Sequence, residues 1–535
     1  MEQAVTRAAP DSRKYRLRHW TLGVLSLSLL VIALDVTILN VAIPTLQRDL
    51  GASASELQWI VNAYILVFAG LLLTMGTLGD RFGRRRALES GMVIFGTASL
   101  AAALSDSSGQ LIAARAAQGI GGALIMPSTL SVLVDVFPRE ERAKAIGIWA
   151  AVAALGIPLG MVLGGWLLEQ ASWGSIFLIN LPVVVSALIA GRFLVPESRD
   201  PSPGPIDVMG AVLSMAALGA LVYSLIEAPE RGWLAPLTVG GLGGALLLGA
   251  VFVWFEAHAR APMLDVRLFS NARLSAGSGA VGIVFMAMLG TMFLITQYLQ
   301  FVRGYTPLET GLRLVPLALG FMVGAPLSAV LVGRLGTKKV IAGGMFIVAI
   351  MIGGMSVLDL TTGYPLIAAL LLFTGVGMSN AMAPATDAVM AAVPESQAGV
   401  ASALNDTTRQ VGGALGVAVY GSILNSLYAS NLAEALSGLP ASASDAANNS
   451  IGGALQVAAS AGGEVGAGLT LAASTAFVDA EAIVHLVTGA VVLAGAVLVA
   501  RFMPAHDLDV VGAAVGRADD RSVGQLVGVP VAVEE

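Results

Sequence analysis

Cysteine is absent from the 535 residues, which excludes disulfide bonds, thiolate metal sites and cysteine nucleophiles. Charged residues are also scarce, at 12% of the chain, against about 25% in soluble globular proteins. This composition excludes a soluble multidomain enzyme. The net charge of −6 and the isoelectric point near 5.4 exclude a nucleic-acid-binding protein, which needs a strongly basic surface.

Two kinds of catalytic motif are missing as well. The Walker pattern G-x-x-x-x-G-K-[ST] does not occur, and the nearest string, GRLGTKK at 333–339, lacks its ending. The four histidines are scattered over positions 19, 258, 485 and 506. We therefore expect neither an ATP-driven pump nor an enzyme, and no metal or cofactor. A sensor would need a larger soluble output domain than the tail provides.

What the chain has in abundance is apolar sequence. Hydrophobic residues make up 56% of it, its mean hydropathy is +0.81, and many apolar runs reach about 20 residues, enough to cross a bilayer about 30 Å thick. We predict an all-α integral membrane protein with 14 spans, at 20–46, 57–78, 88–104, 110–134, 143–168, 175–195, 207–226, 236–256, 274–301, 310–332, 340–358, 365–391, 401–427 and 480–502.

Lysine and arginine predict the orientation, because these residues are concentrated in cytoplasmic loops. With both termini in the cytoplasm, only Arg48, Arg231 and Arg303 fall in loops on the outer side. The chain then divides into a basic arm, six helices, an inserted hairpin, six more helices and a cytoplasmic tail (1–19, 20–195, 207–256, 274–502 and 503–535). The external loop 428–478 is either a short amphipathic hairpin or disordered. The basic arm has no cleavage site after it, so the first span is a retained helix.

The two groups of six helices are related by an internal repeat at an offset of 253 residues. Leu46, Gln47, Gly51, Ser53 and Glu56 match Leu299, Gln300, Gly304, Thr306 and Glu309, and Arg81, Gly83, Gly91 and Met92 match Arg334, Gly336, Gly344 and Met345. After a slip of three residues, Gly156, Gly160 and Gly165 match Gly412, Gly416 and Gly421. Two parallel halves favour a rocking transporter with its binding site between them.

Several ordered motifs carry a family resemblance. GTLGDRFGRRR at 76–86 resembles the G-x-L-a-D-R-x-G-R-[RK] loop of the major facilitator superfamily, and LDVTILNVAIP at 34–44 resembles the first-helix signature of its 14-span drug:proton antiporters, the QacA/EmrB-like branch. RAAQGIGGA at 115–123, WGSIFLINLP at 173–182 and NDTTRQVGGALG at 405–416 are also similar to that branch. The resemblance covers nearly the whole chain and implies the major facilitator fold and proton-driven export of amphipathic, often cationic compounds across the bacterial cytoplasmic membrane.

The fifth helix departs from this family at one position. The antiporter signature G-P-x-x-G-G begins here at Gly160, with Met161 in place of proline, and ends at Gly164 and Gly165. Pro158 lies just before it and can bend the helix, because proline removes a backbone hydrogen bond. We assign Gly156, Pro158, Gly160, Gly164 and Gly165 to this antiporter motif, and whether Met161 loosens coupling is left open by the sequence.

Asp35 is the first candidate for chemistry. It lies well inside the first span, where a charge costs about 2.5–3.5 kcal/mol on insertion scales, and such residues are usually functional. We predict that it takes a proton from outside and releases it inside, and that a drug cation competes for the same carboxylate. Arg115 in the fourth span is its natural partner. The alternatives are a permanent ion pair that locks the helices, or an arginine that only binds backbone carbonyls.

Asp406 and Arg409 are one turn apart on the thirteenth span and share a face. Related antiporters have a carboxylate at the position of Asp406 that is implicated in cation recognition. Because Arg409 can neutralise this carboxylate, substrate recognition and structural pairing are equally open.

The loop Gly76–Arg86 has a different predicted role. Asp80, with Arg81, Arg84 and Arg85, can form a cytoplasmic charge latch that holds the outward-facing state. Gly76 and Gly83 permit the tight turn and close helix approach. Positive-inside orientation explains some of these arginines but does not explain Asp80.

The substrate pocket is predicted from aromatic, methionine and polar residues in the spans. Methionine supplies flexible contacts, although most such residues face lipid or other helices. The candidates, which include Asp35 and Asp406, are Trp59, Asn62, Tyr64, Phe68, Met126, Asn180, Met292, Phe293, Gln297 and Asn380. We expect a monomer whose partners are the lipid bilayer, protons and small amphipathic substrates. The alternative is a dedicated exporter of one endogenous metabolite or antibiotic.

Overall fold

Long apolar helices build the described part of the protein, which in the computed structural model comprises residues 16–199, 207–259, 262, 264–393, 398–437 and 439–504. No strand occurs among these residues. Most of the basic arm 1–19 and nearly all of the tail 503–535 lie outside this part. So do the side chains at several positions of 139–157 and those of 398–403.

The helices follow the order expected from the apolar runs. The N-terminal group comprises α2 (Arg18–Leu50), α3 (Ala54–Phe82), α4 (Arg84–Ala103), α5 (Ser108–Val136), α6 (Arg139–Gln170), α7 (Ser175–Leu178) and α8 (Asn180–Leu194). The inserted hairpin comprises α9 (Val208–Arg231) and α10 (Pro236–His258). The C-terminal group comprises η1 (Val266–Ser270), α11 (Ala272–Gln297), η2 (Tyr298–Val302), α12 (Pro307–Leu335), α13 (Thr337–Gly354), η3 (Met355–Val357), α14 (Tyr364–Ala391), α15 (Ala398–Leu432), α16 (Ala441–Asn449), α17 (Ile451–Ala461) and α18 (Gly463–Phe502).

The predicted number of 14 spans is not confirmed. Among the described residues, 12 helices are long and apolar enough to cross a membrane. Helices α4 and α6 are the two that are missing from this set. Three arginines and Glu89 occupy the first turns of α4 and leave it a short apolar stretch. Several side chains of α6 lie outside the described part, to which the set of 12 is restricted.

The internal repeat is visible in the way equivalent helices begin. Ser53 and Glu56 form a capping box at the start of α3, and Thr306 and Glu309 form the same box at the start of α12. In each box the hydroxyl and the glutamate satisfy two backbone N–H groups that no helical carbonyl reaches. Gly83 and Gly336, which precede α4 and α13, both have positive φ (121° and 82°). The matched sequence positions therefore make the same local structure.

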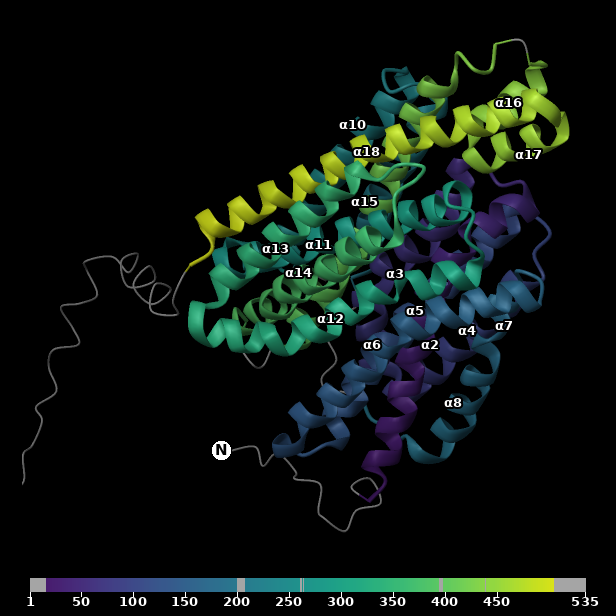
Figure 1. Ribbon diagram of the computed structural model, residues 1–535. Coiled ribbons are helices and arrows are strands. Elements are labelled where there is room, and N and C mark those ends of the chain that lie inside the picture. Colours follow the sequence, from purple (N-terminus) through teal and green to yellow (C-terminus); the bar gives the residue numbers. More distant parts are fainter. Residues whose placement is uncertain are drawn as a thin grey trace, which may run out of the picture.

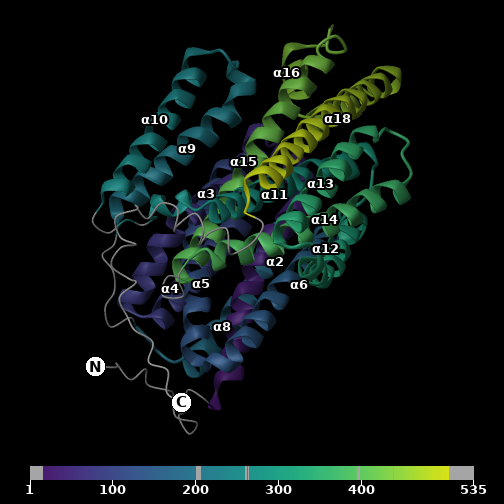
Figure 2. The same cartoon turned by 90° about the vertical axis from the view of Figure 1, so that its left-hand side faces the viewer.

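The helices pack in equivalent ways within the two groups. Helix α3 packs on α5, and α2 packs on α6; in the C-terminal group α12 packs on α14, and α11 packs on α15. The two groups lie beside each other in Figure 1 and diverge toward the end where α2 begins and α18 ends. The inserted α9 and α10 form a pair at one side, where α9 contacts α3 and α15 (Figure 2).

The predicted external loop 428–478 is largely helical. Helix α15 extends to Leu432, α16 and α17 follow, and α18 begins at Gly463 rather than at the predicted residue 480. Helix α17 reaches the N-terminal group, since a Cβ on Gly452 would lie 2.8 Å from Gln47 Oε1. The Gln456 side chain also donates to the Arg48 carbonyl (3.3 Å). These alanine- and glycine-rich helices thus cover the end of α2.

The two groups touch each other at the end of the molecule opposite to the start of α2. Gln300 of η2 donates to the carbonyl of Val41 in α2 (2.8 Å), and the Leu308 N–H at the start of α12 donates to the Glu169 carboxylate at the end of α6 (3.3 Å). On the other side of the seam, the Ser422 hydroxyl of α15 lies 3.4 Å from Gln58 Oε1 of α3. These contacts close that end.

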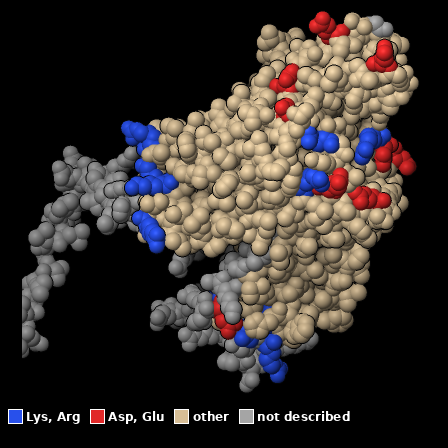
Figure 3. All heavy atoms as spheres, in the orientation of Figure 1, with Lys and Arg blue, Asp and Glu red and all other residues tan. Residues whose placement is uncertain are grey.

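On the face of the molecule drawn in Figure 3, exposed charged side chains gather at the ends. One diverging end carries basic side chains and the other carries basic and acidic ones, a wide belt has no charge, and acidic and basic side chains mix at the opposite end (Figure 3). Ionised groups avoid the hydrocarbon core of a bilayer. The uncharged belt is therefore the surface that the membrane covers.

Candidate functional site

A stripe of glycines brings α6 against α2 at the level of Asp35. A Cβ on Gly156 would lie 2.6 Å from the Cβ of Ala33, and one on Gly160 would lie 2.0 Å from Thr37 Oγ1. One turn further, a Cβ on Gly164 would lie 2.4 Å from Ile38 Cγ1. Only glycine permits this approach. The spacing i, i+4, i+8 puts all three on one face of α6.

Gly165 and Met161 point from α6 to the other group of helices. A Cβ on Gly165 would lie 2.5 Å from the Cα of Leu308, and one on Gly311 would lie 2.2 Å from the Met161 carbonyl. Met161, which departs from the antiporter signature discussed above, is fully buried at this contact between α6 and α12. Pro158 lies inside α6, between Gly156 and Gly160. The motif therefore serves two interfaces.

The same packing recurs in the C-terminal group. Cβ atoms on Gly412 and Gly416 would lie 2.2 Å and 2.1 Å from the carbonyl oxygens of Gly282 and Met286, so α15 rests on α11 as α6 rests on α2. At the position equivalent to Asp35, however, α11 has Met288. A carboxylate is therefore present at this level on α2 but not at its repeat equivalent.

Asp35 is completely buried, and three side chains bind its carboxylate. Arg115 of α5 forms an ion pair with Oδ2, and its own exposed fraction is 1%. Oδ1 accepts hydrogen bonds from the side-chain amides of Gln118 (3.1 Å) and Asn180 (2.9 Å). Ser99 of α4 accepts from both amides (2.8 Å and 3.3 Å). The predicted Asp35–Arg115 pair is thus made and fully enclosed.

Arg115 is itself held in a fixed position. Its Nε donates to the carbonyl of Ile60 (3.3 Å), and its Nη1 donates to Gln118 Oε1 (2.8 Å). Its guanidinium carbon lies 4.5 Å from the centre of the Tyr64 ring, and that ring stacks on Phe68 at 5.6 Å. Arg115 therefore contacts a carboxylate and a backbone carbonyl at the same time, so both kinds of contact considered for it are present.

Two members of this cluster escaped the sequence analysis. Gln118 is one turn after Arg115 and shares its face, a spacing that could have identified it. Ser99 lies on α4, and no signal in the sequence distinguishes it from the other small residues of that helix. The structure places Gln118, Ser99 and Asn180 around one carboxylate, and amides at this position hold it whether or not it carries a proton.

Asp406 and Arg409 meet on one face of α15, with 3.6 Å between Oδ1 and Nη1. Arg409 also donates to the Thr386 hydroxyl (3.1 Å), and its guanidinium carbon lies 5.5 Å from the centre of the Phe285 ring. The predicted pair is formed. Arg409 joins α15 to α11 and α14, so it has a packing role besides its contact with Asp406.

The segment from Gly76 to Arg86, predicted as a loop, is almost entirely helical. Gly76 to Phe82 form the end of α3, α4 begins at Arg84, and Gly83 alone makes the turn. Asp80 Oδ1 accepts from Arg84 Nε (2.7 Å), whereas the Arg81 guanidinium lies over the Phe82 ring (5.9 Å). The end of α3 packs closely on α4 at Gly79, because a Cβ on this residue would lie 3.2 Å from Ala87 Cβ.

Glu197 is a member of this cluster that the sequence analysis missed. Its carboxylate lies 3.9 Å from Arg85 Nε and 3.6 Å from Arg86 Nε, and it accepts from the backbone N–H of Arg85 (3.3 Å). A Cβ on Gly83 would lie 2.6 Å from Glu197 Oε1. The segment after α8 is thereby fastened to the turn between α3 and α4.

The predicted substrate residues do not share one cavity. Tyr64, Phe68 and Asn180 belong to the cluster around Asp35, while Trp59 faces the inserted hairpin, with its ring 6.1 Å from that of Tyr223. The side-chain amides of Gln297 and Asn380 donate hydrogen bonds to backbone carbonyls of their own helices (3.1 Å and 2.8 Å). Asn62 is fully buried, with no hydrogen bond to its side chain. Met126 is partly buried, and Met292 and Phe293 are buried in the core.

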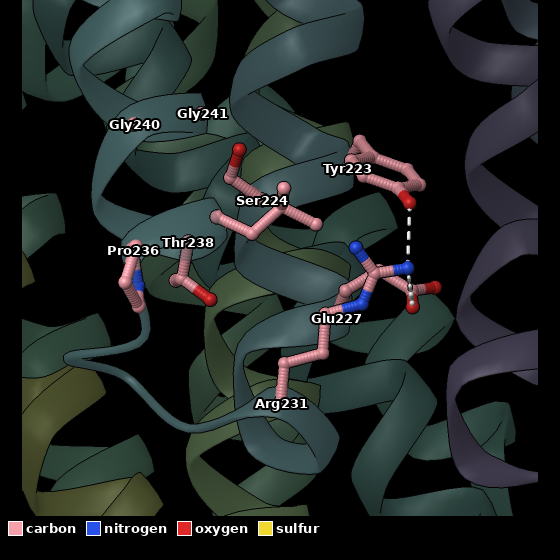
Figure 4. Close-up of a pocket in the computed structure, with 9 residues that line it drawn as sticks. Tyr223, Ser224, Glu227, Arg231, Pro236, Thr238, Gly240 and Gly241 are labelled. Atoms are coloured by element: carbon pink, nitrogen blue, oxygen red, sulfur yellow. Dashed lines mark hydrogen bonds and ion pairs between the residues drawn. The ribbon is translucent and has the colours of Figure 1, made fainter.

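Two cavities adjoin the inserted hairpin instead. A small one of about 380 Å³ lies between α9 and α10 near their turn, where Arg231 contacts the Tyr223 hydroxyl (2.7 Å) and Glu227 (3.1 Å) (Figure 4). A larger one of about 1170 Å³ lies between the hairpin, α3, α11 and α15. Its lining is mostly apolar and includes Thr407 and Thr408, directly after Asp406. Apolar cavities of this size suit small amphipathic ligands.

Comparison with known proteins identifies the family. Residues 25–417 match the model of the Major Facilitator Superfamily. Among solved structures, a bacterial homolog of the human lysosomal transporter Spinster, in an inward-facing and unoccupied conformation, has a TM-score of 0.66 at 18% identity, covering 91% of this chain and 98% of its own. At this identity the likeness concerns the fold alone.

Relatives similar along most of their length are resistance and export proteins. The multidrug efflux pump LfrA of Mycolicibacterium smegmatis is 36% identical over 92% of this chain and 97% of its own. The methyl viologen resistance protein SmvA of Salmonella typhimurium is 36% identical (89% and 96%), and the tetracenomycin C resistance and export protein of Streptomyces glaucescens is 37% identical (77% of each). The chain therefore belongs to the Major Facilitator Superfamily and, within it, to the drug efflux transporters rather than to any class of enzyme.

Proposed function

We propose that this protein is a proton-driven antiporter that exports amphipathic, mainly cationic compounds from the bacterial cytoplasm by alternating access. The observation that carries the proposal is the carboxylate of Asp35, which is fully buried and bound by Arg115, Gln118 and Asn180. An intramembrane carboxylate is costly and marks proton or ion pathways. Its amide neighbours can accept or donate, so the cluster can hold the carboxyl group in either charge state.

The proposed coupling follows from competition for one carboxyl group. When Asp35 binds a proton, its attraction to Arg115 falls, and Arg115 is free to turn to other partners such as the Ile60 carbonyl that it already contacts. When a cationic substrate approaches, the carboxylate is favoured and the proton leaves. One charge moved through 100 mV is worth about 2.3 kcal/mol, so one proton per cycle can drive substantial accumulation.

The contacts between the two groups of helices support alternating access. They gather at the end opposite to the start of α2, as in the bonds Gln300–Val41 and Leu308–Glu169. With the termini in the cytoplasm, as the lysine and arginine distribution predicts, this arrangement is inward-facing. The charge latch of Gly76, Asp80, Arg81, Gly83, Arg84 and Arg85 would then engage on the opposite, cytoplasmic side in the outward-facing state.

The apolar cavity beside the hairpin supports an amphipathic cargo. Its volume of about 1170 Å³ suits a flat aromatic cation, and Thr407 and Thr408 of α15 belong to its lining. The Asp406–Arg409 pair lies on another face of the same helix, where Arg409 contacts Thr386 of α14. We propose that substrate passes between this cavity and the Asp35 cluster, with Asp406 attracting the cation. Relatives with names that specify methyl viologen, a dication, or multidrug efflux favour this cargo class.

The second candidate function is a dedicated exporter of one antibiotic or metabolite. It is favoured by relatives such as the tetracenomycin C resistance and export protein, whose name specifies a single compound. Breadth of substrate response separates the two functions, because a dedicated exporter responds to one compound and a multidrug antiporter to many cations.

The test is substrate-driven proton release from inverted membrane vesicles, with ethidium and methyl viologen as probes. We compare the unmodified protein with Asp35→Asn and with the control Asp49→Asn, an exposed acidic residue near the end of the same helix. Antiport predicts proton flux with both probes in the unmodified protein and the control, and none in Asp35→Asn. Flux that persists in Asp35→Asn excludes this carboxylate as the coupling site, and no flux in any correctly inserted variant excludes the cation antiporter.

A further inference from the structure

Helix α18 carries a buried polar stripe that the proposed cycle does not use. Ser474, Glu481, His485 and Thr488 lie on one face of this apolar helix and are all buried. Glu481 and His485 are exposed by only 2% and 1%, respectively. This stripe faces the core of the C-terminal group, where the repeat has no carboxylate equivalent to Asp35.

Glu481 and His485 have no hydrogen bonds that would explain their burial. The closest approach of their polar atoms, from Glu481 Oε1 to His485 Nε2, is 3.9 Å, too long for a hydrogen bond. Glu481 Oε1 and both ring nitrogens of His485 lack any hydrogen-bond partner. A bare carboxylate in this setting is costly. Binding of one proton removes this cost. The proton either lies on Glu481, with a neutral His485 imidazole beside it, or lies on His485, which makes an imidazolium paired with the Glu481 carboxylate.

Few other titratable groups face this pair. Helix α15 presents the phenols of Tyr420 and Tyr428, next to Thr488 and Phe477 of α18. The η2 turn packs against α18 and carries the phenol of Tyr298. Along this stretch the described parts of α11, α13, α17 and η3 present none, since the charged residues of α11 and α13 lie at their other ends. On α18 itself, Asp479 is exposed. The nearest cation on this side, Arg303, acts on the Tyr298 phenol and donates to the Leu360 carbonyl. Among the described residues, no lysine or arginine forms an ion pair with Glu481.

Tyr298 connects the pair to the closed end of the molecule. It is buried at the start of η2, a π-helical turn, and its hydroxyl donates to the carbonyl of Asp359 (2.8 Å). Arg303, beyond the same turn, donates to the carbonyl of Leu360. Two residues after Tyr298, Gln300 donates to Val41 of α2. π-Helical turns are frequent at functional sites, and this one links α18 to the contact between the two groups.

We propose that Glu481 and His485 form a second proton-binding site, whose occupancy controls the contact between η2 and α2. With the proton bound, the pair is neutral overall, Tyr298 keeps its bond to Asp359, and Gln300 holds Val41. When the proton leaves to water, the Glu481 carboxylate draws the Tyr298 hydroxyl away from Asp359, η2 shifts, and the two groups part at this end. The site's role in transport rests on the proposed proton-driven function, but its proton-dependent opening does not.

The chain contains no cysteine, so a thiol-reactive spin label attaches only at cysteines introduced by substitution. Spin labels are attached to the full-length protein at Asp49→Cys and Gly363→Cys, exposed positions at the closed end of the two groups. The distance between the labels is measured by pulsed electron paramagnetic resonance, without substrate, between about pH 5 and pH 9. The variants are Glu481→Gln, Glu481→Asp and His485→Gln, and the matched control is Asp479→Asn on the same helix.

We expect the short-distance population to increase as the pH falls. The ratio of the short-distance to the long-distance population should change by up to about tenfold per pH unit, because one proton is bound. Glu481→Gln, which imitates the protonated form, should show the short distance at every pH. His485→Gln and Glu481→Asp should displace the midpoint, and Asp479→Asn should match the parent. If Glu481→Gln does not fold, a midpoint unmoved in both other variants overturns the proposal.

Other results separate this inference from the proposed function. A parent distance that does not change with pH overturns the inference, as does a pH response that persists in Glu481→Gln. A response that is lost in Asp35→Asn but kept in Glu481→Gln overturns it too, and leaves the coupling at Asp35. Absence of substrate-driven proton flux, together with a pH response that Glu481→Gln abolishes, refutes the proposed antiport and supports the second proton site.

Discussion

The ion pair between Asp35 and Arg115 predicts an asymmetric pair of mutational effects. Asp35→Asn leaves the Arg115 guanidinium buried without a counter-charge, and arginine cannot lose its proton. The new amide also faces the donors of Gln118 and Asn180, which bound the carboxylate. Removing one partner of a buried ion pair costs about 3–5 kcal/mol. We expect Asp35→Asn to fall in this range.

The reverse substitution should be milder. Arg115→Gln leaves a buried carboxyl group that can take up a proton and become neutral, so the cost is below that of Asp35→Asn. In the double variant Asp35→Asn/Arg115→Gln both charges are gone, and much of the lost free energy of unfolding should return. The control is Arg84→Gln, because its pair with Asp80 is partly exposed and such pairs contribute about 0–1 kcal/mol.

The measurement is reversible unfolding of the four purified variants and the parent in detergent, combined as a double-mutant cycle. Transport by the double variant then separates the two roles of the pair. A stable but inactive double variant indicates that Asp35 couples protons, whereas a stable and active one indicates a structural lock. The reasoning is refuted if Asp35→Asn costs no more than the Arg84→Gln control, or if the effects of the single substitutions simply add.

Three further predictions concern other parts of the molecule. Gly160→Val should destabilise the protein by about 1–3 kcal/mol through overpacking against α2, whereas Gly219→Ala, with open space around it, should be neutral in the same unfolding assay. Hydrogen bonds from Thr362, and then from Thr361, hold the pKa of Asp359 below its usual value. The 355–364 turn therefore keeps this stabilisation above about pH 3.9 and loses it as the pH falls through the lower native pKa. Hydrogen exchange should show this opening of the turn in acid, and Asp359→Asn should remove the pH dependence. Glu197→Gln should slow transport in the vesicle assay by releasing the Gly83 turn, with stability changed by less than about 1 kcal/mol because its pairs are partly exposed; an unchanged rate would show that this anchor has no part in the cycle.

The sequence by itself determined the membrane class, the repeat and the first members of the site. Apolar runs, the offset of 253 residues and the motifs around Asp80 and Arg115 are local patterns, and the structure reproduces their local consequences, such as the paired capping boxes of α3 and α12. A carboxylate and an arginine in separate apolar spans also had to find a partner, because each alone is costly in a membrane. Their pairing was therefore predictable.

Only the tertiary structure decided what surrounds these residues. Whether 428–478 is helical and which way Trp59 points depend on packing between distant segments. Ser99, Gln118 and Glu197 are ordinary residues in the sequence and acquire a role from the atoms opposite them. The pattern along one helix reports which face is apolar, but helix rotation and depth are set jointly by all neighbours. That is why the pairing of charges could be read from the chain, whereas the meeting of Asn180, Gln118 and Ser99 around one carboxylate could not.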